Sequence, residues 1–108
     1  MIVTAISENT VAHPGNRQPN YIIVSVTNQN GEPVTGLNAT NFKVEALIVG
    51  PGGALVNISR VAGGAQGFYY IDVVPVQSYT WVSGTYIFGV SVTKGAQKGQ
   101  TLTSVLLD

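Results

Sequence analysis

Charged side chains are scarce in this chain of 108 residues and make up only 9% of it. Five basic residues balance five acidic ones, so the formal net charge is zero. Nucleic-acid binders carry a basic patch, and disordered tails carry an excess of one sign. The composition therefore predicts neither a nucleic-acid partner nor a disordered chain.

Cysteine is absent, which excludes a disulfide framework, a thiolate nucleophile and a cysteine-ligated metal site. Uninterrupted apolar runs reach only about four residues, whereas a membrane-spanning helix needs roughly 20. No basic segment followed by an apolar stretch marks a signal peptide. We therefore expect no membrane insertion, and the excess of Ser, Thr, Asn and Gly favours a secreted or cell-surface protein.

Residues that favour helices are also few, whereas the chain holds 13 glycines, five prolines and many Val and Thr. Alternation of apolar and polar residues, interrupted by turn residues, predicts about seven short strands and no long helix. The expected strands cover residues 2–6, 21–27, 42–49, 54–60, 68–74, 85–93 and 101–107. The length is that of one domain, and we expect residues 1–108 to form a single all-β, two-sheet sandwich.

Period-two alternation also predicts which side of each strand faces the core. The expected inward residues are Ile22, Val24, Val26, Phe42, Val44, Ala46, Ile48, Val56, Ile58, Tyr69, Ile71, Val73, Tyr86, Phe88, Val90 and Val92. Five apolar residues fall on the opposite side, namely Ile23, Leu47, Leu55, Phe68 and Ile87. If several of these adjoin, they form a patch that binds a neighbouring domain or subunit.

Two local sequence patterns resemble those of known families. The segment 26–37, VTNQNGEPVTGL, resembles the strand-turn "V-x-D-x-x-G-x-P-V-x-G" of bacterial surface immunoglobulin-like repeats, with Asn28 where Asp is commoner. Segments 67–75 and 84–92 resemble the paired G-x-Y strands of filamin-type and bacterial immunoglobulin-like domains. The resemblance implies a seven-stranded immunoglobulin-like sandwich in which the Tyr86 hydroxyl bonds to nearby backbone. Phe88 occupies the slot of the disulfide cysteine of antibody domains, which implies a core held by packing alone.

Groups for catalysis are few. His13 is the only histidine and lies in a Pro-Gly loop, where a solvated residue is the expected role. The five carboxylates are far apart in sequence, and no G-x-S-x-G elbow is present. The segment 50–53, GPGG, lacks the Lys-Ser/Thr of a phosphate-binding loop and reads as a turn. We therefore expect no enzyme activity, no cofactor and no metal site.

Tyr79 and Trp81 are the residues of greatest functional interest, because aromatic rings on a sandwich loop can stack on sugars or on an apolar partner. The alternative is that Trp81 folds back and plugs the open end of the sandwich. These two readings give different functions, and the sequence leaves both open.

The sequence favours a non-enzymatic structural or adhesive module of a larger exported or surface assembly. The alternative function is a carbohydrate- or other ligand-binding accessory module that uses Tyr79 and Trp81. We expect a protein partner or neighbouring domain, or self-association through a terminal strand together with Ile23 and Ile87. The reason is that neither terminal strand carries a charged residue, in segments 2–7 and 101–107, that would oppose pairing of its edge with another chain.

Overall fold

The computed structural model describes all 108 residues and contains seven β-strands and one short 3-10 turn. In chain order these are β1 (Ile2–Glu8), β2 (Asn20–Thr27), η1 (Ala39–Asn41), β3 (Phe42–Ile48), β4 (Val56–Gly63), β5 (Phe68–Pro75), β6 (Gly84–Lys94) and β7 (Gln97–Leu107). The predicted all-β class and the predicted number of strands are thereby confirmed.

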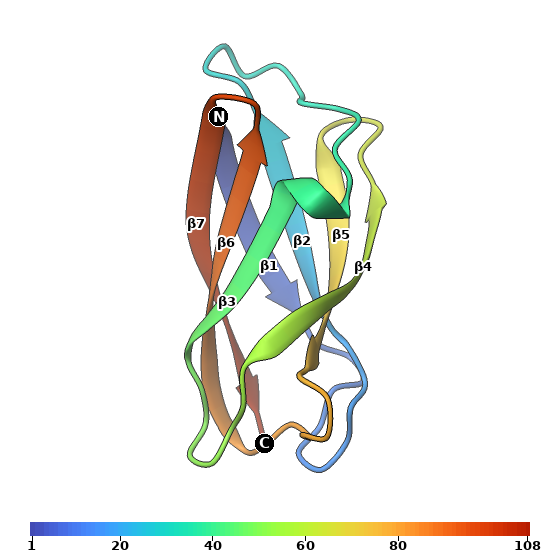
Figure 1. Cartoon of the computed structure of the whole chain (residues 1–108), viewed down its shortest axis with the longest axis vertical. Coiled ribbons are helices and arrows are strands. Elements are labelled where there is room, and N and C mark those ends of the chain that lie inside the picture. Colours follow the sequence, from blue (N-terminus) through green and yellow to red (C-terminus); the bar gives the residue numbers. More distant parts are fainter.

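The strands form two antiparallel sheets that pack face to face as a sandwich (Figure 1). One sheet has four strands in the order β1-β2-β5-β4, and the other has three in the order β3-β6-β7. The molecule measures 41 × 20 × 20 Å. The strands run along its long axis, and the two termini lie at opposite ends of that axis (Figure 1).

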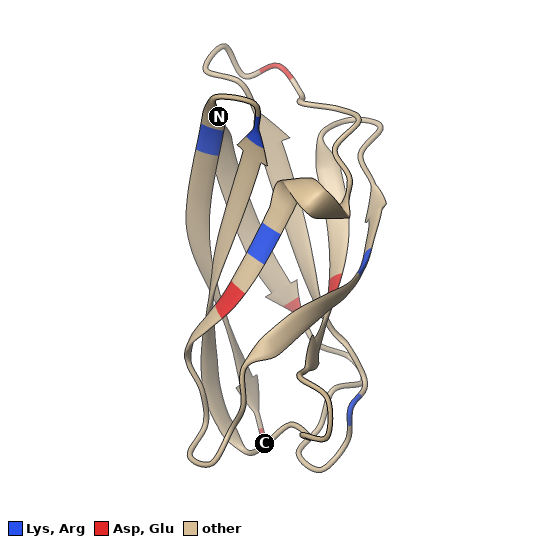
Figure 2. Ribbon diagram, in the orientation of Figure 1, with Lys and Arg blue, Asp and Glu red and all other residues tan.

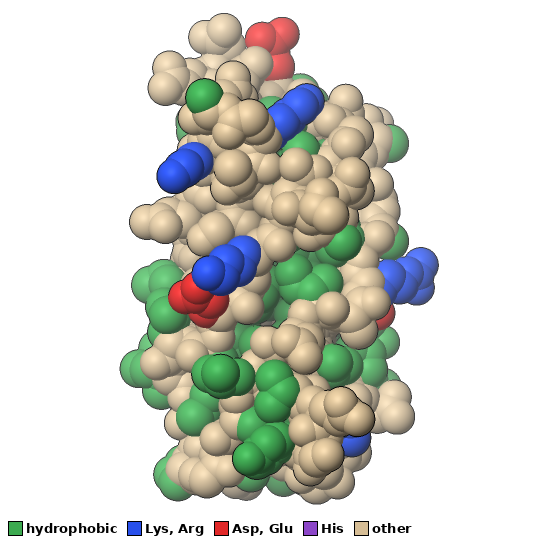
Figure 3. Space-filling view, viewed as in Figure 1, with side chains coloured by type: hydrophobic (Ala, Val, Ile, Leu, Met, Phe, Trp, Pro, Cys, Tyr) green, Lys and Arg blue, Asp and Glu red, His purple; other side chains and the backbone are tan.

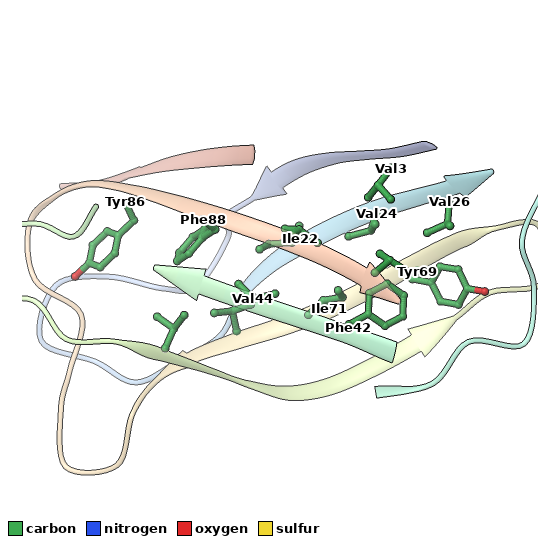
Figure 4. Packing of buried hydrophobic residues seen from close by; sticks show 14 of the residues in the cluster. Val3, Ile22, Val24, Val26, Phe42, Val44, Tyr69, Ile71, Tyr86 and Phe88 are labelled. Atoms are coloured by element: carbon green, nitrogen blue, oxygen red, sulfur yellow. The ribbon is translucent and has the colours of Figure 1, made fainter. Parts of the chain in front are cut away.

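The core lies between the sheets and is built from the side chains that alternate inward along each strand. Ile22, Val24 and Val26 of β2 are fully buried, as are Phe88 and Val90 of β6. Figure 4 shows these inward side chains from the two sheets meeting along the length of the sandwich. Alternation has this result because successive side chains of a strand point to opposite faces of its sheet.

Two tyrosines lie toward opposite ends of this core (Figure 4). The Tyr86 hydroxyl accepts a hydrogen bond from Val82 N–H (3.0 Å) and donates one to the Val82 carbonyl (3.3 Å). This is the contact with nearby backbone that the resemblance implied. The Tyr69 hydroxyl donates to the Val34 carbonyl (2.7 Å) and accepts from Leu37 N–H (3.2 Å). Each ring is buried while its hydroxyl fastens a loop.

The turn after β2 is organised by the side chain of Asn28. Its Oδ1 accepts hydrogen bonds from the backbone N–H groups of Asn30 (2.9 Å) and Glu32 (3.0 Å). Gly31 has a φ of +81°, the conformation for which an Asn-Gly dipeptide is suited. The chain reverses here, as the sequence predicted. Asn28 supplies the acceptor oxygen that an aspartate would supply at this position.

Ile48 is the clearest error in the predicted core, because its side chain is 53% exposed. A β-bulge between Ala46 and Ile48 shifts the register of β3 against β6. The extra residue interrupts strict alternation, so Ile48 is carried to the outer side, opposite Ile87. The bulge is a property of the pairing between strands, and the sequence of β3 alone does not encode it.

The bounds of two strands differ from the prediction by three residues or more at one end, and the other five differ by one or two. β4 begins at Val56 and continues to Gly63, with a register shift between Ile58 and Arg60. β7 begins at Gln97 instead of residue 101, because the turn from β6 spans only two residues, 95 and 96. Two-residue loops are the commonest connection in β-hairpins. Because this loop is so short, residues 97–100, which were predicted to lie in the turn, belong to β7.

Candidate interaction surfaces

The Trp81 side chain is buried and fills one end of the sandwich. It is 1% exposed, and its indole Nε1 donates a hydrogen bond to the Gln18 carbonyl (2.7 Å). The ring meets Tyr86 edge to face, with centroids 5.2 Å apart and planes at 89°. A buried ring offers no face to a ligand, so the reading of Trp81 as a stacking residue is corrected in favour of the plug.

Tyr79, by contrast, is exposed on the loop between β5 and β6, with 53% of its surface accessible. Arg17 holds this loop by donating hydrogen bonds to the carbonyls of Pro75 (3.1 Å), Val76 (3.0 Å) and Tyr79. The loop is therefore fastened to the segment before β2, and the Tyr79 ring is left facing solvent. The two predicted loop aromatics do not form one site.

Ile23 and Ile87 lie on opposite outer sides of the sandwich. Ile23 alternates with the buried residues of β2 in the four-stranded sheet, and Ile87 alternates with those of β6 in the three-stranded sheet. Both side chains are half-buried. A single contact surface therefore does not contain both residues, because the sheets that carry them face away from each other.

Ile23 belongs to an apolar cluster that we call the four-stranded face, formed by Ile6, Ile23, Phe68 and Tyr70. Ile6 lies opposite Ile23 in the β1–β2 register, and Ile23 lies opposite Tyr70 in the β2–β5 register. Ile6, Phe68 and Tyr70 are 63%, 51% and 50% exposed. The sequence identified Phe68 and Ile23 as outward residues but had no means of placing Ile6 beside them.

Ile87 belongs to a second cluster, the three-stranded face, formed by Leu47, Ile48, Ile87, Leu102 and Leu106. Leu102 and Leu106 of β7 are each 61% exposed, and Leu47 is 54% exposed. Sequence reasoning missed the two β7 leucines because inward and outward positions of that strand both mix apolar and hydroxyl residues. Only the register with β6 decides which side they occupy.

The terminal strands lie at the sheet edges, as expected, but their edges abut each other. β1 and β7 run side by side: the Met1 ammonium donates to the Lys98 carbonyl (3.2 Å), and the hydroxyls of Ser7 and Thr103 lie 3.1 Å apart. A Cβ on Gly99 would lie 2.5 Å from Cγ2 of Val3. The terminal side of the sandwich is therefore closed by the chain itself.

The opposite side, between the edge strands β3 and β4, is open. A groove of about 650 Å³ lies along this β3–β4 seam, and its apolar lining includes Phe42, Val44, Leu55, Val56 and Ile58. Figure 3 shows hydrophobic side chains gathered in this hollow in the middle of the visible face. The sequence did not predict the groove, because it forms where two strands fail to meet.

One ion pair borders the seam. Lys43 Nζ lies 2.7 Å from Glu45 Oε1, and the two side chains are 71% and 53% exposed. Figure 2 shows them as a blue and a red segment of β3 with a short tan stretch between them. The hydrogen bond to Glu45 and its charge raise the pKa of Lys43 above its ordinary value of 10.5, so Lys43 is positively charged at neutral pH.

His13 is exposed in the loop before β2, where its backbone N–H bonds to Asn16 Oδ1 (3.1 Å). No group of three or more His, Cys, Asp or Glu side chains converges in a way that could hold a metal ion. No helix of the structure has the length and apolar character needed to cross a membrane.

A scan of protein-family models, a search of curated proteins and a search of solved structures each found no match to this chain.

Proposed function

We propose that this chain is an immunoglobulin-like interaction module, structural or adhesive and without catalytic activity of its own, in a larger exported or surface assembly. The observation that carries the proposal is the pair of exposed apolar faces on the two outer sides of a sandwich that has its own hydrophobic core. Exposed apolar clusters rimmed by polar residues mark sites where proteins bind one another. The rest of the surface is too poor in charge to favour a nucleic-acid partner.

The strand order supports the immunoglobulin-like assignment. A constant-type immunoglobulin domain has seven strands, A to G, arranged as ABED in one sheet and CFG in the other. The present order, β1-β2-β5-β4 and β3-β6-β7, is the same arrangement in chain order. The hydroxyl of Tyr86, near the start of the sixth strand, bonds to backbone four residues upstream, as the tyrosine corner of such domains does.

The geometry of the termini supports a structural role within a larger assembly. They lie at opposite ends of a long axis of 41 Å (Figure 1). Modules joined through such termini extend in line, so that both outer faces stay accessible to neighbours. The low charge and the abundance of Ser, Thr, Asn and Gly support an exported or surface location.

Site-specific photo-cross-linking tests the interaction role. A photoreactive phenylalanine analogue would replace Phe68 on the four-stranded face or Leu102 on the three-stranded face, in the protein expressed in its native cells. We expect covalent adducts with protein partners from at least one of the two positions, identified by mass spectrometry. The matched control is Gln100, an exposed outward residue of β7 two positions from Leu102.

Adducts from the apolar positions alone would support the proposal. Equal labelling from Gln100, or no protein adduct from either face, would overturn it. Protease treatment of intact cells gives a separate test of location: we expect a surface-exposed chain to be cleaved, and complete protection would contradict the surface assignment.

The ligand-binding alternative retains one of its two aromatic residues. Tyr79 presents an exposed ring on a loop that Arg17 holds in place, and a fixed, exposed ring is a suitable surface for stacking on a sugar. Isothermal titration with soluble polysaccharides tests this function. Binding that Tyr79→Ala abolishes and Tyr79→Phe preserves would establish it; no binding to any polysaccharide would exclude this ligand class.

A further inference from the structure

We propose that two copies of this chain form a symmetric dimer by pairing their β3 strands antiparallel along the β3–β4 seam, with the two-fold axis at Val44. The pairing would join the two three-stranded sheets into one continuous sheet of six strands. The proposal deepens the interaction role proposed above by naming a second copy as one partner, and it rests on that role. Four observations carry it.

The first observation is that β3 has an unpaired edge in an accessible place. β3 pairs only with β6, and β4 pairs only with β5. The backbone N–H and C=O groups that β3 directs away from β6 therefore face the seam, and an edge of this kind is a template for another strand. Figure 3 shows the seam facing the viewer, and η1 borders the groove only at the end where β3 begins.

The second observation is the contrast with the other side of the sandwich. There β1 and β7 abut, and Gly99 allows β1 to approach until no space for a Cβ remains. The terminal edges thus cover each other, whereas no strand of this chain pairs with β3 or β4 across the seam. Self-association through a strand edge is therefore easier at β3 than at either terminal strand.

The third observation fixes the centre of the pairing. Proteins guard their edges with proline, charge and bulges. β3 contains no proline, its two charged residues are of opposite sign and pair with each other, and its bulge lies after Ala46. Phe42 to Ala46 is therefore a regular stretch with no net charge. The midpoint of these five residues is Val44, so a two-fold axis there pairs all of them.

The fourth observation is that the charges select the same register. With the axis at Val44, Lys43 lies opposite the partner's Glu45 at both symmetric positions, and opposite charges across antiparallel strands stabilise the pair. Moving the axis by one residue would place Lys43 opposite the partner's Lys43, or Glu45 opposite the partner's Glu45. Both side chains are exposed in the monomer, so they are free to exchange partners.

Apolar contacts complete the interface. Phe42, Val44 and Ala46 lie on the inner side of β3, so the paired strand of a second copy would bring its own inner residues over the open groove. Leu55, which is 66% exposed in the seam, would be covered. β4 offers no comparable template, because its register shifts within the strand at residue 59.

Charge reversal tests the dimer. Sedimentation equilibrium of the purified chain at low ionic strength, over micromolar to millimolar concentrations, should reveal a monomer–dimer equilibrium. Lys43→Glu and Glu45→Lys each create two like-charge contacts and should raise the dissociation constant about ten-fold. An equimolar mixture of the two variants restores both opposite-charge contacts, so it should form a heterodimer about as tight as the wild-type dimer.

Lys98→Glu on β7 and Glu8→Lys on β1 are the matched controls, because they make the same changes of net charge at exposed positions of the terminal edges. Both should leave the dissociation constant unchanged, and circular dichroism checks that all four variants fold. A strictly monomeric wild type, a dimer insensitive to the β3 reversals, or one weakened equally by the terminal-edge controls would overturn the proposal. A monomeric wild type that still gives protein adducts from Phe68 or Leu102 would overturn the dimer and leave the interaction role standing.

Discussion

Phe88 and Ile87 are neighbours in β6, but their side chains lie on opposite sides of the sheet. The Phe88 side chain is fully buried and stacks near Tyr86, with ring centroids 6.1 Å apart. Ile87, the next residue, points outward and is only half-buried. The two substitutions to alanine should therefore differ sharply in their effect on stability.

We expect Phe88→Ala to lower the free energy of unfolding by about 3–5 kcal/mol, through lost burial and the cavity left behind. Ile87→Ala removes contacts on an outer face and should cost much less. Urea denaturation of the two variants, followed by far-ultraviolet circular dichroism, measures both values. Equal costs at concentrations where the chain is monomeric would contradict the observed register of β6.

Asn20 is the only buried polar residue in the chain. It lies at the start of β2 opposite Val73, and neither Nδ2 nor Oδ1 hydrogen-bonds to another group of the protein. A buried polar group without a partner costs free energy, whereas an apolar group of similar volume does not. We expect Asn20→Leu to raise the free energy of unfolding by about 1–2 kcal/mol.

Chemical denaturation measures the effect of Asn20→Leu, with Asn57→Leu as the control. Asn57 is exposed on β4, and substitutions at exposed positions usually change stability by no more than about 0.5 kcal/mol. A clear loss of stability in Asn20→Leu would contradict the prediction and would mean that the amide is hydrogen-bonded in solution.

At the scale of elements, the contact between β1 and β7 depends on one residue without a side chain. A Cβ on Gly99 would meet Cγ2 of Val3 at 2.5 Å and the Met1 carbonyl oxygen at 2.8 Å. The backbone oxygen cannot move away without displacing β1. Gly99→Ala should therefore cost about 1–3 kcal/mol and loosen the terminal strand.

Hydrogen exchange locates this effect: amides of β1 should exchange faster in Gly99→Ala, while those of β5 keep their protection. Gly89→Ala is the matched control, because Gly89 lies in β6 with only the flexible Leu47 side chain near the added atom, at 3.3 Å or more. We expect it to be neutral or slightly stabilising. A similar loss of stability in both variants would show that strand glycines matter here for a reason other than the β1–β7 contact.

At the scale of the whole molecule, the fold joins residues that are far apart in the sequence. β1 lies beside β7 although the two strands are the first and last of the chain, and β2 pairs with β5 across about half of the sequence. Forming such contacts requires closing long loops before any stabilising contact is gained. The domain should consequently fold slowly for its size.

Stopped-flow refolding tests this expectation with the single tryptophan as the reporter. Trp81 is buried at one end of the core, so its fluorescence follows the formation of tertiary structure. We expect a dominant phase in the range of milliseconds to seconds, as for other all-β sandwiches. Folding in microseconds would contradict the argument from topology.

The sequence by itself determined the strands and most of their inner faces. Alternation along a strand is a local property, because it follows from the geometry of an extended backbone. Ile22, Val24 and Val26 could be assigned to the core with no knowledge of what covers them. Turn residues such as Asn30 and Gly31 were equally readable, because their conformations are set by their own chemistry.

Only the tertiary structure decided how these elements meet. The bulge that exposes Ile48, the burial of Trp81 and the placing of Ile23 and Ile87 on opposite sides all depend on contacts between segments far apart in the chain. The closed β1–β7 side and the open β3–β4 seam have the same origin. A local pattern predicts whether a residue points inward or outward. The strand order and the register decide which surface an outward residue belongs to, and both depend on the packing of the whole core.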